Sequence, residues 1–359
     1  MIEAASQQQL MPAGEPQVEL REASEDGGLG YTATFEVMPE VKVADLAAQT
    51  VTRVTADVTE ADIDEMIDKL RSQRTVWNDV ERGAKDGDTV HIDFKGTIDG
   101  EAFEGGTAQN VPLVLGSGSM IEGFEAGLLG AKAGDDRTLE VTFPQDYRAQ
   151  HLAGKKAVFE VKVQRVAEPQ LPEINEEFVK AFGVEEGTVE ALRADVAKNM
   201  RHELKQRLNS LTKERVMDAL IAANPMEIPK ALLNQEAERM KQQMVQDMQQ
   251  RGQRSTVDLP ASVFADQARR RVHLGLLVAE IIHDQKLSPG EDQLRETIAD
   301  FAESYEDPQE VVDYYLKDPN ARKSIENLVL ENQVVEWALG QMQVTDEAKS
   351  FSDVMDNKG

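Results

Sequence analysis

The sequence predicts an α+β multidomain protein in which a half-open antiparallel β-barrel is inserted into an elongated, all-helical domain with arm-like projections. Two patterns along the chain predict this layout. Between residues 86 and 166, apolar and polar residues alternate with a period of two, which is typical of half-buried β-strands. After Pro169 the apolar period becomes about 3.6 residues, which is typical of amphipathic helices, and it keeps that value afterwards.

The barrel is predicted from three alternating runs and one tight turn. Residues 89–95 form the first run, and Asp99-Gly100 follows as a hairpin turn because both residues tolerate a positive φ. Residues 137–143 and 157–163 alternate in the same way. These runs predict antiparallel strands with one face buried.

Two helices are predicted close to these strands in the sequence. Ile121, Phe124 and Leu128 recur at helical spacing, so we expect them to share one face of a short helix. Thr59 caps a second helix, because an acidic residue, Asp62, stands three positions after it. The second helix is amphipathic, and we expect it to pack on a segment that is distant in the sequence.

Six further helices are predicted after Pro169. Proline marks the start of two of them, since it is tolerated in the first helical turn. We predict helices at about 189–224, from Pro229, from Pro260, at about 293–305, at about 308–316 and through 325–339. Nearer the N-terminus, residues 2–10 have a short helical pattern, and a strand beginning at Tyr31 continues into a linker.

The composition excludes several classes of function. The formal net charge of −27 argues against nucleic acid and against an anionic membrane as partners. The chain has no cysteine, which excludes disulfides and cysteine ligands. It has no phosphate-binding loop, so no nucleotide cofactor is expected. No apolar run is long enough to span a membrane.

No metal site is predicted either. The acidic residues Glu303, Glu306 and Asp307 are better explained as a solvated loop. The five histidines are scattered and show no spacing typical of metal ligands; they are His91, His151, His202, His273 and His283. We therefore expect no cofactor and no metal.

The barrel segment resembles the FKBP family of peptidyl-prolyl isomerases. The matching motifs are DFKG, EAFEGG, LVLGSGSMIEGFEAG and FEVKV, which occur in the order and spacing of the family. The resemblance implies that X-Pro bonds are isomerised in an apolar pocket without a nucleophile, metal or general base. It also implies the catalytic residues Phe94, Phe103, Glu104, Met120, Ile121, Phe124, Tyr147 and Phe159, with Val111 as a substrate-binding residue.

The same resemblance implies individual roles. Phe124 would lie beneath the proline ring, the backbone N–H of Ile121 would bind the carbonyl before the bond, and Tyr147 would donate a hydrogen bond at the rim. The other phenylalanines would form the walls. The sequence departs from the small human-type isomerases at Phe94 in place of tyrosine, Phe124 in place of tryptophan and Val111 in place of phenylalanine. We expect the pocket to hold proline but to bind macrolide inhibitors poorly. From the pattern alone, packing in a barrel core is the better explanation of these aromatic residues, because most buried phenylalanines only pack.

The complete chain resembles the trigger factor family of bacterial chaperones. The resemblance rests on the inserted barrel, on LPEINEEFVKAFGVEEGTVEALRADV after it and on YEDPQEVVDYY near the end. It implies an ATP-independent, cytoplasmic chaperone that holds nascent or unfolded polypeptides and is involved in protein transport and cell division. It implies a remnant of the ribosome-binding domain at 1–35, a linker strand and helix packing with the C-terminal domain at 36–80, the isomerase domain at 81–166 and the helical chaperone domain at 167–359.

One departure from this family concerns the ribosome. Trigger factors dock through a basic Gly-Phe-Arg-x-Gly-Lys loop, and no such motif occurs here. The one Gly-Phe pair, Gly123-Phe124, is followed by Glu125 and belongs to the barrel. We therefore expect this chain to lack most of the N-terminal domain and, unlike the family, not to bind ribosomes.

A methionine stripe in the helical part is a second candidate site. Met240, Met244 and Met248 recur every four residues, and flexible, polarizable methionines suit apolar contact with many ligands. The pattern alone favours the core of a helical hairpin, although a thin hairpin also leaves apolar surface exposed. We predict that this stripe binds substrate polypeptides. The rival interpretation of the protein is a non-catalytic adaptor whose barrel only recognises proline-containing segments.

Overall fold

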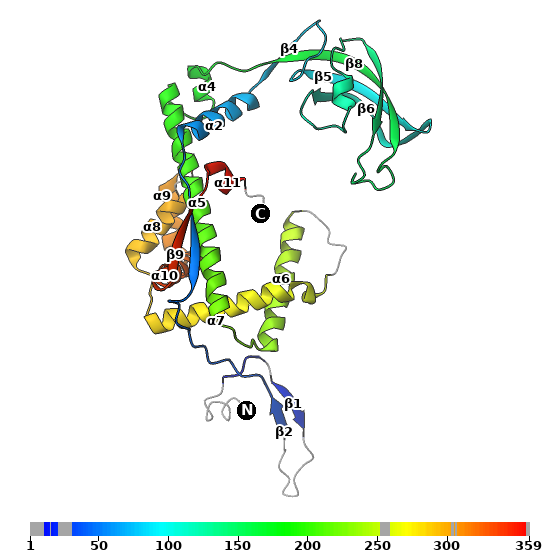
Figure 1. The fold of residues 1–359 in the computed structure, drawn as a ribbon. Helices are drawn as coiled ribbons and strands as arrows, with labels where there is room; N and C mark the ends of the chain where they lie inside the picture. Colours follow the sequence, from blue (N-terminus) through cyan, green and yellow to red (C-terminus); the bar gives the residue numbers. More distant parts are fainter. Residues whose placement is uncertain are drawn as a thin grey trace, which may run out of the picture. The chain divides into compact units, whose positions relative to one another are not determined.

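The computed structural model describes residues 11–14, 16–20, 31–251, 259–302, 305 and 307–356. It divides into two compact units, residues 58–202 and residues 1–57 together with 203–359. Figure 1 shows the elements of each unit. The short helix predicted for residues 2–10 lies outside the described residues.

An antiparallel sheet of five strands forms most of the unit at residues 58–202. Its strand order is β4-β8-β5-β6, and β7 also pairs with β8. The strands curl around the short helix α3 (Figure 1). The elements are β4 (Val76–Asp79), β5 (Thr89–Ile98), β6 (Glu101–Val114), α3 (Phe124–Gly127), β7 (Asp136–Thr142) and β8 (Lys156–Gln170).

The hairpin between β5 and β6 turns at the predicted residues. Asp99 and Gly100 both have positive φ, at 53° and 86°, so the sequence prediction of this turn is confirmed. Along β5, Val90 and Ile92 are completely buried, whereas His91 and Asp93, which alternate with them, are half-buried. The period-two pattern thus assigns one face of the sheet to the core.

The core of this unit lies between the inner face of the sheet and α3. Phe124 and Leu128 are buried there, with 1% and 0% of their surfaces exposed. Helix α3 begins only at Phe124, because Gly123 before it adopts a left-handed conformation with φ 90°. Ile121 therefore lies in the preceding loop, and the prediction that it shares a helical face with Phe124 and Leu128 is wrong.

Helix α2 (Glu60–Gln73) begins at the predicted cap. The Thr59 side chain accepts a hydrogen bond from the Asp62 N–H, and the Asp62 carboxylate accepts one from the Thr59 N–H. Two other carboxylates of α2 form ion pairs with Arg193 of the long helix α5. The prediction that α2 packs on a segment distant in the sequence is thus confirmed.

Helices are present in all six predicted segments after Pro169. Helix α6 packs against η1 and α7, and α8 packs against α9 and α10. No helix in the described ranges is long and apolar enough to cross a membrane. The helices are α4 (Glu176–Lys180), α5 (Val189–Ala223), α6 (Lys230–Gln250), η1 (Ala261–Phe264), α7 (Ala265–Gln285), α8 (Glu291–Ala302), α9 (Pro308–Lys317), α10 (Pro319–Gln341) and α11 (Phe351–Met355). The unit of residues 1–57 and 203–359 also contains the antiparallel pair β1 (Gln17–Leu20) and β2 (Tyr31–Thr34).

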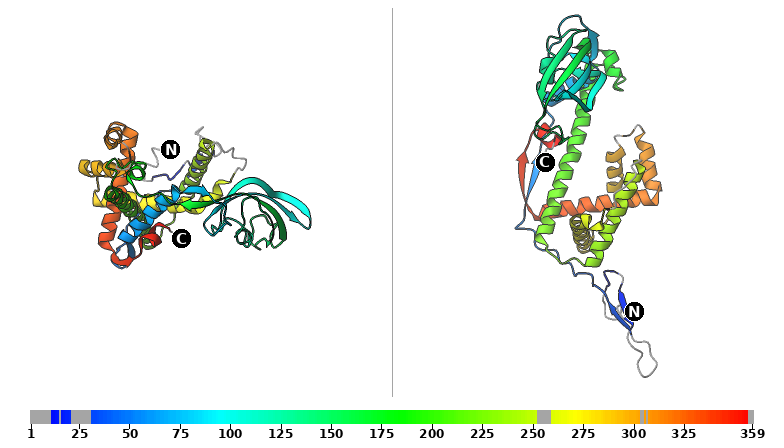
Figure 2. Two further views of the ribbon diagram at one scale, coloured as in Figure 1. Left: turned by 90° about the horizontal axis from the view of Figure 1, so that it is seen from above. Right: turned by 90° about the vertical axis from the view of Figure 1, so that its right-hand side faces the viewer.

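The prediction of an all-helical C-terminal part is wrong near its end. Strand β9 (Gln343–Ala348) pairs in parallel with β3 (Thr50–Thr55), and Figure 2 shows both strands beside α5. Arg215 of α5 donates a hydrogen bond to the carbonyl of Thr52 at 2.7 Å, which fixes β3 to the helix. Four of the six residues of β9 are polar or charged, and its two acidic residues are disfavoured in strands. Its conformation therefore comes from a partner strand far away in the sequence.

Candidate functional site

Three phenylalanine rings from different elements meet in the core of the sheet unit. Phe94 of β5 lies 6.0 Å from Phe124 of α3 and 6.0 Å from Phe159 of β8, measured between ring centroids. The Phe124 and Phe159 centroids are 5.2 Å apart. All three pairs are edge to face, which is a favourable geometry for aromatic rings. Phe124 and Phe159 are buried and Phe94 is half-buried.

A second group of rings continues this cluster. Phe103 of β6 contacts Phe159 at 6.0 Å and Phe143 at 5.8 Å. Tyr147 lies over Phe143 with 4.7 Å between the centroids. Phe143, which sequence reasoning did not include in the site, supports both Phe103 and Tyr147. Its signal was its inward position in the run at residues 137–143.

Two glycines make room for the ring of Phe103. A Cβ atom on Gly96 would lie 2.6 Å from Phe159 Cε1 and 2.9 Å from the Phe103 ring. A Cβ atom on Gly106 would lie 2.8 Å from Phe103 Cζ. No side chain fits at either position without displacing an aromatic ring. Gly96 ends the DFKG motif and Gly106 ends the EAFEGG motif. The sequence analysis used both motifs but did not predict that their glycines make room for an aromatic ring.

The structure brings together all but one of the residues implied for the isomerase site. Glu104 is exposed, no hydrogen bond or ion pair within the described ranges involves it, and it is not part of the core cluster. The buried pair Phe124 and Phe159 forms the base of the cluster. The partly exposed residues that pack against the same core are Phe94, Phe103, Val111, Met120, Ile121 and Tyr147.

The loop before α3 is closed by the carboxylate of Glu125. This carboxylate accepts backbone hydrogen bonds from Gly116 at 2.8 Å, Gly118 at 3.2 Å and Met120 at 3.0 Å. The Ser117 hydroxyl lies 3.4 Å from it. Burial raises the pKa of Glu125, but the hydrogen bonds from Met120, Gly118 and Gly116 outweigh it and leave the pKa lowered. The carboxylate is therefore ionised at neutral pH.

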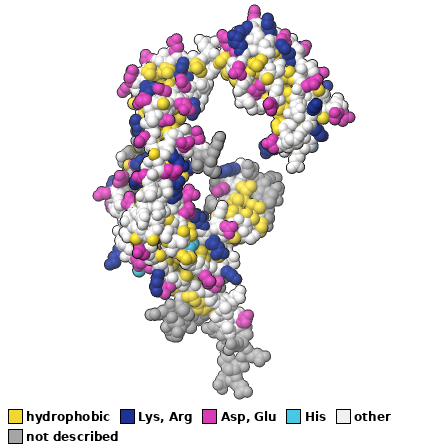
Figure 3. Space-filling view, viewed as in Figure 1, with side chains coloured by type: hydrophobic (Ala, Val, Ile, Leu, Met, Phe, Trp, Pro, Cys, Tyr) yellow, Lys and Arg dark blue, Asp and Glu magenta, His cyan; other side chains and the backbone are white. Residues whose placement is uncertain are grey.

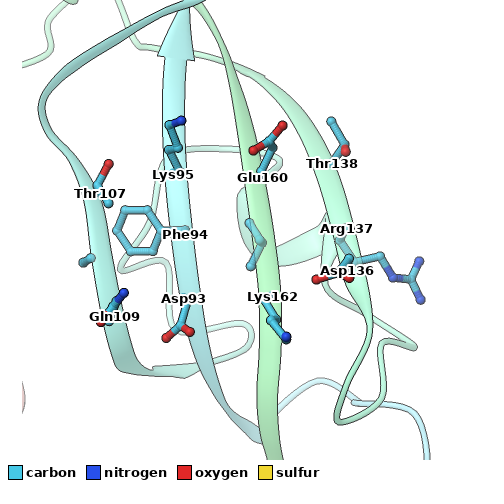
Figure 4. A pocket seen from close by; sticks show the side chains of 12 residues that line it. Asp93, Phe94, Lys95, Thr107, Gln109, Asp136, Arg137, Thr138, Glu160 and Lys162 are labelled. Carbon is cyan, nitrogen blue, oxygen red and sulfur yellow. The ribbon is translucent and has the colours of Figure 1, made fainter.

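Two concave surfaces lie near this cluster, and they differ in character. A cavity of about 330 Å³ has Met120 and Ile121 in its wall. A groove of about 540 Å³ lies on the outer face of the sheet, where Figure 4 shows its lining side chains on four neighbouring strands. In this groove Lys95 of β5 stands opposite Glu160 of β8, and Asp93 stands opposite Lys162. Such cross-strand charge pairs stabilise the sheet, but a charged groove does not suit a proline ring.

A second aromatic cluster, which we call the aromatic patch, lies on α8, on α9 and at Tyr305 between them, in the other unit. It consists of Phe301, Tyr305, Tyr314 and Tyr315. Ring centroids are 5.5 Å apart for Phe301 and Tyr305, and 5.6 Å apart for Phe301 and Tyr315. The exposed fractions are 42% for Phe301, 50% for Tyr305 and 58% for Tyr314. Sequence reasoning missed this patch, although three of the five tyrosines of the chain fall within it.

The methionine stripe (Met240, Met244 and Met248) lies on α6. Each of the three side chains is half-buried, and Ala237 is the buried residue of this helix. Figure 3 shows hydrophobic side chains gathered over α6. The stripe is therefore partly packed in the hairpin of α6 with η1 and α7 and partly accessible to solvent.

One group among the described residues has a geometry that would allow metal ligation. Glu280, His283 and Asp284 place their ligand atoms within 4.8 Å of one another at the end of α7. They lie on the surface, with the His283 side chain 81% exposed, and carboxylates commonly gather there without an ion. Of the acidic loop considered in the sequence, Glu303 and Glu306 lie outside the described residues.

Comparison with known proteins identifies families that the sequence of this chain matches. The family model described as FKBP-type peptidyl-prolyl cis-trans isomerase matches residues 80–164. The model of the bacterial trigger factor C-terminus matches residues 188–340, and a further bacterial trigger factor model matches residues 1–70. The isomerase match includes every residue implied for the proline site, and it favours an enzyme over a non-catalytic adaptor.

Similar proteins from several bacteria are trigger factors. Those of Stutzerimonas stutzeri (strain A1501) and Pseudomonas putida (strain W619) are each 48% identical over 98% of this chain and 80% of their own length. That of Azotobacter vinelandii is 47% identical over the same shares. A solved chain from work on promiscuous substrate recognition by the trigger factor chaperone has 18% identity and a TM-score of 0.44, covering 94% of this chain and 82% of that one.

The match at residues 1–70 corrects one prediction. The missing basic loop suggested that residues 1–35 are only a remnant of the N-terminal domain of the family, and that this chain does not bind ribosomes. The N-terminal family model extends over twice that length. In trigger factors, the N-terminal domain is the part that binds the ribosome, so the predicted lack of ribosome binding is not supported.

Proposed function

The chain belongs to the bacterial trigger factor family, and from that premise we propose which of its residues carry out the two activities of the family. It is a molecular chaperone that holds nascent or unfolded polypeptides, and its FKBP-type domain catalyses cis/trans isomerisation of X-Pro bonds. We further infer that the sheet and α3 form an FKBP-like half-open barrel inserted into the helical domain. The hairpins of α6 with α7 and of α8 with α9 would be its arm-like projections.

The proposed isomerase site is the aromatic cluster around Phe124. Rotation of a peptide bond costs about 18–20 kcal/mol because the planar amide loses its resonance in the twisted state. A twisted amide is less dipolar than a planar one, so apolar surroundings favour the twisted state relative to water. The cluster offers such surroundings: Phe124 and Phe159 are buried beneath the partly exposed Phe94 and Phe103.

The backbone of Ile121 adds a polar contact to this apolar site. Within the described part of the chain, the Ile121 N–H donates to no protein acceptor, while its carbonyl accepts the Phe124 N–H at 3.1 Å. We propose that this N–H binds the carbonyl that precedes the X-Pro bond. Tyr147 is proposed to donate at the rim. We propose no catalytic role for Glu104, because it is exposed and does not contact the cluster.

The isomerisation rate of an X-Pro tetrapeptide tests this site. With the full chain, Phe103→Ala removes a partly exposed wall and is expected to lower kcat/KM at least about tenfold, equivalent to about 1.4 kcal/mol. Phe182→Ala is the matched control, because Phe182 is a half-buried ring outside the sheet that contacts the ring of Phe178. The proposed site is wrong if correctly folded Phe103→Ala isomerises the peptide as fast as the wild type.

We propose that unfolded polypeptides bind to the aromatic patch and to the methionine stripe. The patch supports this proposal because three of its four residues expose about half of their surface, and exposed apolar patches mark interaction sites. Carboxylates of α9, such as Glu310 and Asp313, surround the patch in the sequence and favour solubility. The half-buried methionines can adapt to many side chains.

Suppression of aggregation of a denatured client tests the patch. The double variant Phe301→Gln/Tyr314→Gln removes apolar surface while it keeps helix-forming side chains. It is expected to suppress aggregation several-fold less at equal concentration. Val76→Gln is the control, because Val76 is 55% exposed in β4 and far from α8 and α9 in sequence. Equal protection by the double variant and the wild type would contradict the proposal.

Other properties of the family stay predictions for this chain. The domain limits at residues 35, 80 and 166, the cytoplasmic location and the roles in protein transport and cell division rest on family membership alone. The weak binding of macrolide inhibitors likewise awaits measurement.

A further inference from the structure

The loop of residues 116–121 contains two glycines that do not fix its conformation, and the hydrogen bonds between Ser117 and Ser119 do not reach its last two residues. Gly116 and Gly118 adopt positive φ, at 87° and 67°, and glycine is free to leave such conformations. Met120 and Ile121, which belong to the proposed isomerase site, stand at the end of this loop. Something else must therefore hold the loop in the shape that places these two residues.

The carboxylate of Glu125 has the contacts needed to hold the loop. Its Oε2 atom accepts the N–H groups of Gly116 and Gly118, and its Oε1 atom accepts the N–H of Met120. Hydrogen bonds to an ionised group are about twice as strong as neutral ones. Helix α3 has only four residues, and the carboxylate of its second residue turns back to the loop. The loop is thus wrapped around one negative charge.

These contacts fix Ile121 from both sides. The Met120 N–H, one residue earlier, is bound to Glu125 at 3.0 Å. The Ile121 carbonyl is bound to the Phe124 N–H at 3.1 Å. The Ile121 N–H lies between these two hydrogen bonds and therefore keeps one orientation. It has no acceptor among the described residues.

We propose that Glu125 is a positioning residue of the isomerase: its carboxylate holds the loop so that the Met120 side chain and the Ile121 N–H are presented to the X-Pro bond. This proposal rests on the isomerase site proposed above. Glu125 acts through the backbone and does not touch the substrate. Sequence reasoning did not identify it, because the motif GFEAG gives no sign that its glutamate turns toward the preceding glycines.

The substitution Glu125→Gln tests this role with the smallest change of shape. One carboxylate oxygen becomes an NH₂ group, which donates and cannot accept, so it faces backbone N–H donors and repels them. Glu122→Gln is the matched control, because Glu122 lies three residues earlier, is exposed and forms no hydrogen bond to the loop within the described residues. Both variants remove the same charge from the same segment.

Two measurements on the full chain separate positioning from a general loss of structure. Glu125→Gln is expected to lower kcat/KM for an X-Pro tetrapeptide roughly tenfold, mainly through kcat, because misplacement by about 1 Å can cost up to a hundredfold. Hydrogen exchange of the amides of residues 116–121 is expected to accelerate, while β5 and β8 remain protected. Glu122→Gln is expected to match the wild type in both measurements.

The outcomes distinguish this proposal from the site on which it rests. The positioning role is wrong if Glu125→Gln retains full activity while Phe103→Ala loses it, or if Glu122→Gln loses as much as Glu125→Gln. Full activity in both Phe103→Ala and Glu125→Gln would refute the isomerase site itself. If Glu125→Gln unfolds the sheet, Glu125→Asp decides, because it keeps the charge but draws the carboxylate back from the N–H groups of the loop: faster loop exchange with lower kcat supports the proposal, and unchanged values overturn it.

Discussion

The two aromatic clusters of this protein contain the same kinds of side chain at similar spacing but differ in enclosure. Ring centroids are 5.2–6.0 Å apart around Phe124 and 5.5–5.6 Å apart in the aromatic patch. Phe124 is 1% exposed, whereas Tyr314 is 58% exposed. A curled sheet can surround its rings, while two packed helices leave theirs open on one side. Side-chain type alone therefore does not separate a reaction site from a capture surface.

This difference in enclosure suggests a division of work. A surrounded cluster has a fixed shape and suits one small group, the proline ring. An open patch fits many apolar segments without selecting a shape, which suits a chaperone with unrelated clients. Substitutions in one unit are therefore expected to change the activity of that unit and to leave that of the other unit intact.

The largest effect is expected for Phe124→Ala. The change removes a buried ring that contacts both Phe94 and Phe159, so the unit at 58–202 should lose about 3–5 kcal/mol of unfolding free energy as well as most isomerase activity. Chemical denaturation and the tetrapeptide assay measure the two effects. Suppression of aggregation by the helical unit is expected to persist. A stability loss without loss of activity in the folded fraction would show that Phe124 is only core packing.

A smaller effect, on stability, is expected from the ion pair between Arg82 and Asp88 in the unit at 58–202. The hydrogen bond from Arg82 lowers the pKa of Asp88, which is 2% exposed, below its ordinary value of 3.8, against the effect of burial. Because the folded pKa is depressed, the stabilisation is complete above 3.8 and is lost as the pH falls through the folded pKa. Asp88→Asn should therefore lower the Tm at neutral pH, and its difference from the wild type should shrink as the pH falls below 3.8.

An exposed pair in the other unit is the control for Asp88. The carboxylate of Asp313 in α9 pairs with Lys317 at 2.7 Å, with both side chains largely in solvent. Asp313→Asn should change the Tm little, and added salt should remove what change there is, because surface pairs are screened. A Tm loss in Asp313→Asn as large as that in Asp88→Asn would contradict this contrast.

A moderate effect on capture alone is expected for the methionine stripe. Replacing Met240, Met244 and Met248 by glutamine, a helix former of similar length, should weaken suppression of aggregation without changing tetrapeptide isomerisation. The three side chains are half-buried, so a small loss of stability is also expected. If protection stays equal at matched folded concentration, the stripe is hairpin packing only.

The smallest effect is expected for the cap of α9, which bears two rings of the aromatic patch. Asp307 accepts hydrogen bonds from the N–H groups of Gln309 and Glu310 at 3.1 and 3.2 Å. Asp307→Ala should destabilise the start of α9 by about 1 kcal/mol and slightly weaken capture. Hydrogen exchange within residues 308–317 should detect this fraying even where the aggregation assay does not. Unchanged exchange would show that the cap is not needed.

The sequence predicted those features that depend on local signals. The Asp99-Gly100 turn and the Thr59 cap were located to the residue, because φ preference and capping act within a few positions. Features that depend on distant partners were missed. Strand β9 pairs with β3 far away in the sequence, and its acidic residues Asp346 and Glu347 gave no local signal of a strand.

The candidate site shows the same limit. Motif order brought Phe94, Phe103 and Phe124 together correctly, but Ile121 was wrongly placed on a helix that begins after it. The role of Glu125 was not visible, because side-chain bonds to a glycine loop follow no fixed spacing. The aromatic patch was missed since exposure cannot be read from helical periodicity when two short helices share one small core.

The most direct test of the central claim is to measure both activities on the same two preparations. The account predicts that Phe103→Ala loses tetrapeptide isomerisation and keeps full suppression of aggregation. It predicts the reverse for Phe301→Gln/Tyr314→Gln. If either variant, correctly folded, loses both activities in proportion, the two clusters do not do separate work and the account is wrong.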